Sequence, residues 1–197
     1  MALSVQDAER LQEILSLFYA GRITRDEARL AVIDVILARL RCARVSLWKF
    51  AGDDGTLCLL CFASKATGAE LDTSERVLHQ AEYRGYFNAL IERGIHLSVD
   101  AMDDPALQPM REHYLVPNHI VSMLDACFSL NGRAYGMICC EETGARRVWR
   151  AGDVSALRAI VTKLAVVMSG APESQLWSTP SLAMQALPAV EPRRAEP

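Results

Sequence analysis

Six cysteines are the residues whose chemistry depends most directly on their spacing. Cys58 and Cys61 form a C-x-x-C pair, a spacing found in redox-active and zinc-binding motifs. The pair lies within residues 57–63, an apolar run that predicts a buried strand. Side chains alternate along a strand, so residues three apart point to opposite faces and their sulfurs do not converge. We therefore expect reduced core cysteines, with no metal and no cofactor.

Carboxylates are the second set of residues with chemical potential. Asp125 lies midway along residues 121–130, a strand-like run that is otherwise apolar. A buried carboxylate must be paired or hydrogen-bonded, because its desolvation costs several kcal/mol. Its partner is as readily a loop amide or an arginine as a ligand, so the role of Asp125 stays open. For Asp100 and Asp104, near Pro105, we favour turns closed by bonds to the backbone over ligand binding.

Two of the four histidines, His113 and His119, flank a long loop and could in principle ligate haem or a metal ion. Neither has a carboxylate or cysteine partner at ligand spacing. The sequence therefore predicts no metal-binding residues.

The elements that position these side chains follow from periodicity and from turn residues. Gly and Pro punctuate helical and strand-like segments, and the long connection between residues 100 and 119 is of a length that is usually functional. The predicted order is two helices within residues 1–43, strands at 44–50 and 57–63, a helix at 82–93, a strand at 95–99, the connection 100–119, a hairpin of 121–130 and 133–141, and a helix at 153–169. This order predicts an α+β fold with one antiparallel sheet.

The hairpin turn at Asn131-Gly132 is a strong signal for a two-residue type I′ loop. Counting back from that loop gives a register in which Leu124 opposes Cys139, Ala126 opposes Met137 and Phe128 opposes Tyr135 on one face. The other face would then carry the residues Met123, Asp125, Cys127, Gly136, Ile138 and Cys140.

The helices carry apolar stripes and one clear start signal. Thr24 and Glu27 form a capping box at the start of the second helix. Arg150 is a poor N-cap, which places the start of the last helix at Asp153. Two stripes have the spacing of a core face or of a coiled-coil seam, and we take both as candidates for a dimer interface. The residues are Leu11, Leu15 and Phe18 in the first helix and Val154, Leu157, Val161 and Leu164 in the last.

Charge and targeting signals exclude several classes of protein. The net charge is −3, which argues against a broad electrostatic grip on nucleic acid or on anionic lipid. Asp7, Glu9 and Arg10 interrupt the start, where a secretory signal would need an apolar run, and the apolar stretches are too short to span a bilayer. We expect a cytoplasmic protein that contacts neither nucleic acid nor membrane.

The long connection and the strand after it carry a family resemblance. Residues 100–105 have the pattern D-A-x-x-D-P, residues 114–125 have Y-L-x-P-x-x-I-x-S-M-L-D, and residues 86–90 have Y-F-x-A-L. These motifs resemble GAF domains of a bacterial subfamily often found upstream of histidine kinases and diguanylate cyclases. The resemblance implies a central antiparallel sheet, terminal helices packed on one face, and a loop-covered pocket on the other. The resemblance covers roughly residues 25–169, and five of the eight prolines fall after residue 170. We therefore divide the chain into an N-terminal helix (1–24), a GAF-like domain (25–170) and a Pro-rich tail that we expect to be disordered (171–197).

The function that the resemblance implies is sensing rather than catalysis. We expect a non-enzymatic domain that binds a small molecule, forms a homodimer and signals through helix packing. No effector domain follows, so the expected target is a partner protein in trans. Candidate ligand-binding residues are Tyr86, Phe87, Asp100, Asp104, Tyr114, Ser122, Met123, Asp125 and Cys127.

Two alternatives remain open at this point. One is a dimerising interaction module without a ligand. The other is a thiol-dependent reductase of free methionine sulfoxide that uses Cys127, Cys139 or Cys140, although the cysteine motifs of that family are not recognisable here. The motif that surrounds a tetrapyrrole-binding cysteine in photoreceptor GAF domains is not recognisable either.

Overall fold

A computed structural model describes residues 3–52, 56–73, 76–169 and 175–177. One antiparallel sheet forms its centre, with strand order β3-β2-β1-β7-β6-β5 and with β4 paired to β2. The strands are β1 (Arg44–Ala51), β2 (Cys58–Ala66), β3 (Ala69–Glu70), β4 (Val77–His79), β5 (Ile95–Ser98), β6 (Ile120–Leu130) and β7 (Arg133–Thr143).

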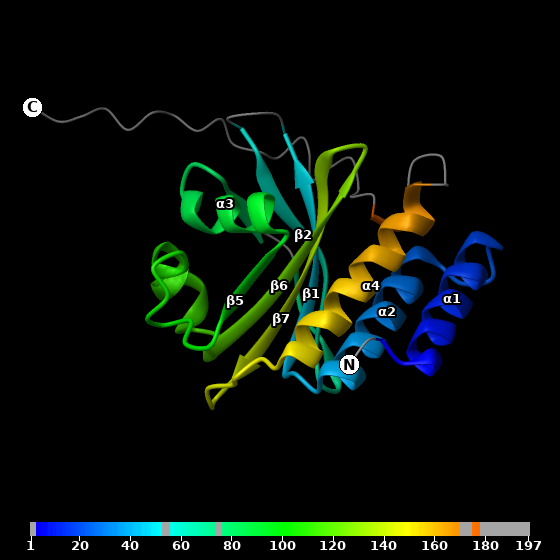
Figure 1. The fold of residues 1–197 in the computed structure, drawn as a ribbon, viewed down its shortest axis with the longest axis horizontal. Coiled ribbons are helices and arrows are strands. Elements are labelled where there is room, and N and C mark those ends of the chain that lie inside the picture. Colours follow the sequence, from blue (N-terminus) through cyan, green and yellow to red (C-terminus); the bar gives the residue numbers. More distant parts are fainter. Residues whose placement is uncertain (1–2, 53–55, 74–75, 170–174, 178–197) are drawn as a thin grey trace, which may run out of the picture.

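Helices cover the sheet unequally (Figure 1). Two long helices, α2 (Arg25–Leu40) and α4 (Ala151–Ser169), pack on one face, and α1 (Val5–Tyr19) packs against α2 as an outer layer. On the other side lie α3 (Arg84–Arg93) and the connection 100–119, which contains the short helical turns η1 (Gln108–Met110) and η2 (Arg111–Leu115). The predicted α+β fold is confirmed. None of the described helices combines the length and the apolarity needed to cross a lipid bilayer.

Helix starts follow their capping residues. The capping box of α2 is formed as predicted, with Glu27 N donating to Thr24 Oγ1 and Thr24 N donating to the Glu27 carboxylate. The predicted start of the last helix at Asp153 is wrong, because α4 begins at Ala151. Asp153 Oδ2 accepts a hydrogen bond from Arg150 N at 3.0 Å, so its carboxylate caps the first turn from inside the helix.

The hairpin turn is confirmed, but its predicted register is wrong in β7. Asn131 and Gly132 both have positive φ, as a type I′ turn requires. A β-bulge then inserts Tyr135 as an extra residue between two paired positions of β7, so every later side chain changes face. Cys139 consequently opposes Asp125, and the predicted partners of Leu124 and Ala126 move by one residue to Cys140 and Ile138.

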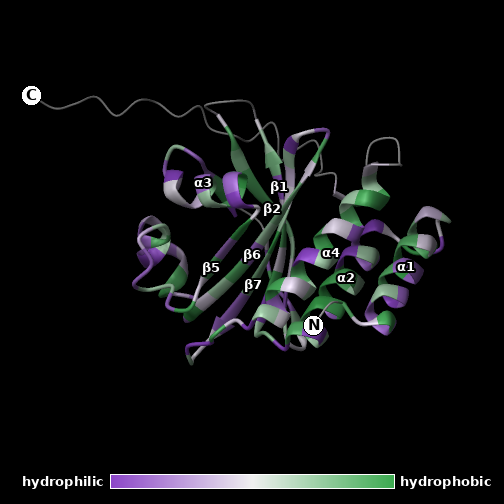
Figure 2. Cartoon of the chain, in the orientation of Figure 1, coloured by the Kyte–Doolittle hydropathy of each residue, from purple (hydrophilic) through white to green (hydrophobic). Residues whose placement is uncertain are grey.

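Two buried clusters lie on opposite faces of the sheet. We call the larger the helix-facing cluster; its members include Leu11, Val32, Leu124, Leu157 and Leu164. The other, the loop-facing cluster, includes Trp48, Phe87, Met110, Met123 and Met137. Figure 2 shows hydrophobic residues along the central strands and on α2 and α4, with hydrophilic residues on α3 and on the outer side of α1.

Residues 175–177 depart from the disordered tail expected for 171–197. They form a 3-10 turn in which Leu176 and Trp177 are fully buried in the helix-facing cluster. The Trp177 indole stacks edge-on against Phe62 and Phe128, and its Nε1 donates to the Trp48 carbonyl at 2.8 Å. A Cβ at Gly136 would collide with this indole, so the glycine leaves the space that Trp177 fills. The rest of the expected tail lies outside the described residues.

Candidate functional site

A row of polar side chains crosses the loop-facing side of the sheet. Successive cross-strand pairs join five residues, one from each of β5, β6, β7, β1 and β2. In that order they are His96, Asp125, Cys139, Ser46 and Ser64, none more than 7% exposed. Polar groups in line on a buried face need partners, because each one left without a partner costs free energy. The strand register therefore builds the site from residues that lie far apart in the sequence.

Asp125 is the centre of this row and is fully buried. Its Oδ2 accepts a hydrogen bond from the Tyr86 hydroxyl at 2.9 Å and lies 3.5 Å from His96 Nδ1. Its Oδ1 accepts no hydrogen bond from any residue that the structure describes. Burial and the negative charge of Asp125 raise the pKa of Tyr86 well above its usual value, so the hydroxyl keeps the proton that it donates. Half of a buried carboxylate thus remains available as an acceptor.

His96 links the sheet to the long connection. Its Nε2 lies 3.2 Å from Asp104 Oδ2, while Nδ1 faces Asp125. Burial by itself would lower the pKa of His96, but hydrogen bonds to the two carboxylates and their charges together raise it above the usual value. The imidazole also stacks edge-on with Tyr86. His96 thus links Asp104 of the connection to Asp125 of β6.

A second buried carboxylate, Glu141 near the end of β7, also links the sheet to the connection 100–119. Its Oε1 accepts a hydrogen bond from the Tyr114 hydroxyl at 2.5 Å, and Arg44 Nε lies 3.2 Å from Oε2. Arg44 also donates to Asn118 Oδ1 at 2.9 Å. Burial raises the pKa of Glu141, and Arg44 and Tyr114 only partly oppose that shift. Two of these partners, Tyr114 and Asn118, belong to the connection, which is thus held to the sheet at both carboxylates.

The predicted site residues fall into two groups. Tyr86, Phe87, Tyr114, Met123 and Asp125 meet on the loop-facing side, where Phe87 packs edge-on against Phe50. Cys127 lies at the margin of the same cluster, and its thiol donates to the Leu90 carbonyl at 2.8 Å.

Three other predicted residues close turns or anchor loops. Asp100 Oδ1 accepts from Met102 N and Asp104 Oδ1 from Ala106 N, which are the turn roles favoured by the sequence. Asp104 additionally reaches His96 through its other oxygen. Ser122 donates to the Val99 carbonyl and accepts from Arg147 N, so it joins β6 to the loop before α4.

The dimer-interface candidates lie within a single protomer's core. Five of them are at most 5% exposed, namely Leu11, Leu15, Leu157, Val161 and Leu164. Phe18 and Val154 are partly buried against the same helix-facing cluster. The heptad-like spacing in α4 is thus the stripe with which this helix packs on its own sheet.

All six cysteines are free thiols. Burial raises the pKa of Cys61 to about 12 and that of Cys127 to about 11. Burial likewise raises the pKa of Cys139 and of Cys140 well above the usual thiol value. Within the described ranges, no three His, Cys, Asp or Glu side chains are grouped as metal ligands.

Sequence reasoning missed His96, Glu141 and Arg44. His96 is one of two polar residues in the run 95–99, with Ser98, and its alternation places it on the face of Asp125 once the strands are paired. Glu141 follows an apolar run and is the last residue of the predicted strand 133–141. The bulge at Tyr135 hid its position, because the predicted register turned this part of β7 to the wrong face.

Solved structures with the same fold share little sequence with this chain. The phycocyanobilin-bound GAF domain of a cyanobacterial phytochrome is 16% identical, with a TM-score of 0.64 over 85% of this chain and 96% of the other. The blue-light-absorbing form of the PixJ GAF domain of Thermosynechococcus elongatus is 12% identical, with a TM-score of 0.61 over 86% and 90%. A GAF domain/HD domain protein of Geobacter sulfurreducens is 14% identical, with a TM-score of 0.58 over 75% and 93%.

A comparison with curated proteins gives no match. The model of the GAF domain family matches residues 25–168, from the start of α2 to the last turn of α4. That span contains the whole sheet, the long connection and the polar row. The chain belongs to the GAF domain family.

Proposed function

We propose that this chain is a sensor domain that binds a small molecule between the sheet and the connection 100–119. The observation that carries the proposal is the buried Oδ1 of Asp125, which accepts no hydrogen bond from the described residues. A carboxylate buried without its full set of partners costs free energy that the fold must offset elsewhere. A ligand donor at Oδ1 would remove that cost.

The chemistry of the site defines the class of ligand. Asp125 and Glu141 offer acceptors, and a neutral or cationic molecule with N–H groups fits them better than an anion does. Fold relatives include GAF domains with bound phycocyanobilin and phycoerythrobilin, which supports small-molecule binding by this kind of domain.

Entry of a ligand requires the loop-facing cluster to repack. Met110, Met123 and Met137 are each at most 2% exposed within it. Methionine side chains are unbranched and adapt to new shapes at low cost. The Tyr86 hydroxyl also contacts Met137 Sδ at 3.4 Å, so a ligand at Asp125 displaces methionine rather than backbone.

The output follows from the ties between connection and sheet. A ligand donor at Oδ1 would engage the same carboxylate that His96 faces at Oδ2, and His96 in turn contacts Asp104 of the connection. The other face of β6 packs against α4, so a shift of this strand reaches the helix layer. We propose that a homodimer reads this shift and passes it to a partner protein. Exposed apolar side chains on α1 and α4, such as Tyr19 and Val166, are available for that contact.

Binding rather than catalysis is the proposed activity. A thiol-dependent reductase needs a thiolate nucleophile at neutral pH. The raised pKa values of Cys127, Cys139 and Cys140 keep these thiols protonated, which argues against that chemistry.

The test is a thermal-shift screen with biliverdin, purine nucleotides, free amino acids and polyamines. We expect at least one of these to raise Tm by several degrees, because a ligand present at 100 times its Kd stabilises by about 2.7 kcal/mol. Asp125→Asn should abolish that shift, whereas Asp103→Asn, which changes an exposed carboxylate on the connection, should keep it. A shift that survives in Asp125→Asn would place the ligand elsewhere.

A ligand-free interaction module is the second candidate. The observation that favours it is the close packing of the loop-facing cluster by the chain's own side chains. A stable dimer that answers none of the compounds, together with a gain in stability for Asp125→Asn, would select this function instead.

A further inference from the structure

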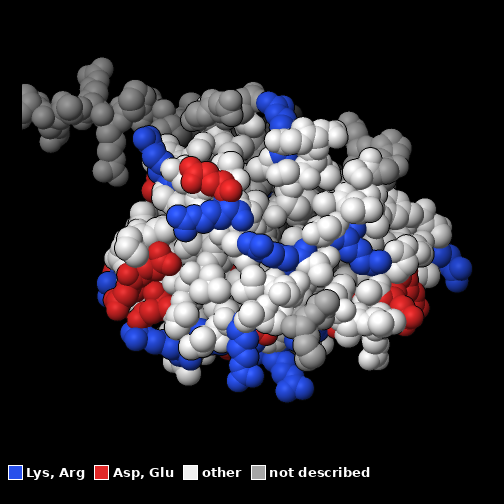
Figure 3. All heavy atoms as spheres, in the orientation of Figure 1, with Lys and Arg blue, Asp and Glu red and all other residues white. Residues whose placement is uncertain are grey.

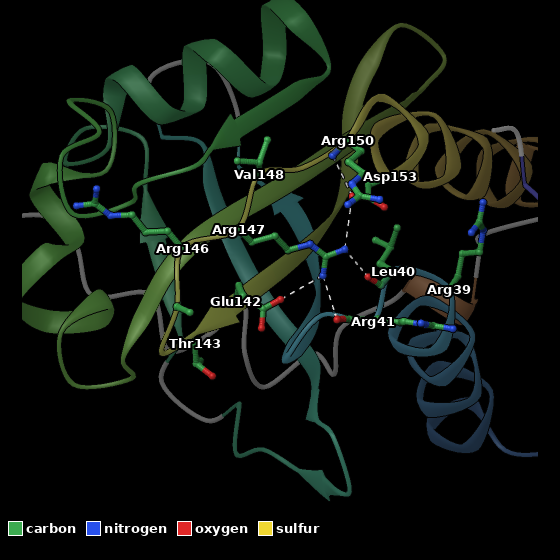
Figure 4. Close-up of a pocket in the computed structure, with 11 residues that line it drawn as sticks. Arg39, Leu40, Arg41, Glu142, Thr143, Arg146, Arg147, Val148, Arg150 and Asp153 are labelled. Carbon is green, nitrogen blue, oxygen red and sulfur yellow. Dashed lines mark hydrogen bonds and ion pairs between the residues drawn. The ribbon is translucent and has the colours of Figure 1, made fainter.

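A hollow lies where α2 ends and β7 leads into α4, away from the loop-facing cluster (Figure 4). Its volume is about 650 Å³, in the range of small-molecule sites in proteins. Five arginines line it: Arg39, Arg41, Arg146, Arg147 and Arg150. It is built from the end of α2 and the loop before α4, whereas the candidate sensor site lies under the connection 100–119.

Arg147 lines this hollow, and its side chain is held by several contacts within the protein. Its guanidinium donates to the Leu40 and Arg41 carbonyls at 2.5 and 3.0 Å and stacks on the Trp149 ring at 4.3 Å (Figure 4). The carbonyls are those of the α2 C-terminus, so Arg147 covers the negative end of that helix. Arg147 also makes ion pairs with two acidic residues.

Those two acids, Glu142 and Asp153, are the carboxylates among the lining residues. Glu142 lies 3.1 Å and Asp153 lies 3.4 Å from Arg147, so their charges are directed at one arginine. Two of the other arginines that line the hollow form ion pairs with carboxylates outside it. Arg39 pairs with Asp7, and Arg146 with Asp100 while 65% of its side chain stays exposed.

Arg41 and Arg150 supply the surplus charge. Both are exposed, and neither side chain makes an ion pair or hydrogen bond with any residue in the described part of the chain. Both residues line the same hollow, and α4 begins there, so its N-terminal end adds positive potential. Figure 3 shows several basic side chains along the lower edge of the molecule, where α2 ends and α4 begins.

We propose that this hollow binds a small molecule through a diphosphate group, with Arg41 and Arg150 as its direct contacts. Guanidinium groups match phosphate oxygens bidentately, so each of the two arginines can bind one phosphate of a diphosphate. Arg147, held by two carbonyls and two carboxylates, positions the loop and leaves the outer arginines to the ligand. This site would bind an anion, whereas the proposed sensor site favours a ligand that donates hydrogen bonds to carboxylates.

Isothermal titration with inorganic pyrophosphate in about 0.15 M salt tests the proposal, because this salt screens diffuse charge beyond about 8 Å. We expect binding by the full chain and about a tenfold rise in Kd for each of Arg41→Ala and Arg150→Ala. The matched control is Arg22→Ala, which removes an exposed arginine before the N-terminus of α2 and should leave Kd unchanged.

Three outcomes with pyrophosphate itself would overturn the proposal. They are no binding of pyrophosphate by the unaltered chain, an equal loss in Arg22→Ala, and equal competition by sulfate at the same ionic strength. Binding of poly-glutamate in place of pyrophosphate would also overturn it, by assigning the hollow to an acidic protein segment. Asp125→Asn separates this site from the sensor site, since it should leave pyrophosphate binding unchanged.

Discussion

The two faces of the sheet differ in how fully a buried charged group is satisfied by hydrogen bonds and ion pairs. On the helix-facing side Arg29 is 4% exposed, but its Nε donates to the Leu176 carbonyl, its Nη1 pairs with Asp26, and its guanidinium stacks on Phe62. Burial lowers its pKa only to about 10, so it stays charged at neutral pH. On the loop-facing side, Asp125 keeps an oxygen that accepts nothing. On the helix-facing side the buried charge is satisfied by the protein's own groups, whereas on the loop-facing side an acceptor is left open for the ligand that we propose.

The largest loss of stability is expected from truncating a core residue of the helix-facing side, where polar and apolar groups alike serve the fold. Leu157→Ala should lower the free energy of unfolding by about 2–5 kcal/mol, because Leu157 is fully buried. Urea denaturation measures this loss, and Thr162→Ala, at an exposed position of the same helix, is the control.

The same experiment at two protein concentrations separates core from interface. If Leu157 acts within one protomer, the loss is independent of concentration. A loss that shrinks at high protein concentration would instead return Leu157 to a dimer seam.

An intermediate effect is expected on the loop-facing side. Tyr86→Phe removes the one hydroxyl that donates to Asp125 and should cost about 1–3 kcal/mol, because the carboxylate stays buried. Tyr83→Phe, on a half-buried ring at the start of α3, is the matched control. A neutral or stabilising result for Tyr86→Phe would mean that Asp125 has no net need of this donor.

The smallest effect is a dependence of stability on pH. The pKa of His96 is raised in the folded state by Asp125 and Asp104, so the protonated imidazole stabilises the fold. That contribution is complete below the unfolded value of about 6.5 and is lost as the pH rises through the raised folded-state pKa.

Replacing His96 with Gln should therefore flatten the fall of Tm with pH above about 6.5. His113→Gln, at an exposed position on the connection, should leave the slope unchanged. An unaltered slope in His96→Gln would show that the imidazole does not carry the charge that links the connection to the sheet.

Local signals predicted most of the fold. The capping box at Thr24, the Asn131-Gly132 turn and the alternating strands each depend on neighbours in the sequence, and each is present in the structure. The bulge at Tyr135 was not predictable, because it is fixed by tertiary packing around Gly136, Phe128 and Trp177.

The candidate site was predictable only in part for the same reason. Asp125 is conspicuous by itself in an apolar strand, and Tyr86 and Tyr114 belong to motifs of the resemblance. His96 and Glu141 gain their meaning from strand pairing, since each becomes a site residue only when it faces the same side of the sheet as Asp125. A register error of one residue was enough to hide Glu141.

Trp177 has a consequence for where this domain ends. The family match stops at residue 168, yet the indole nine positions later closes the space over Gly136 and bonds to β1 through Trp48. A fragment cut at the family boundary would thus open a slot in the sheet directly behind Trp48, whose own indole donates to Ser46 of the polar row. Residues 175–177 therefore belong to the packed core of this domain, although they lie beyond the residues that the family model matches.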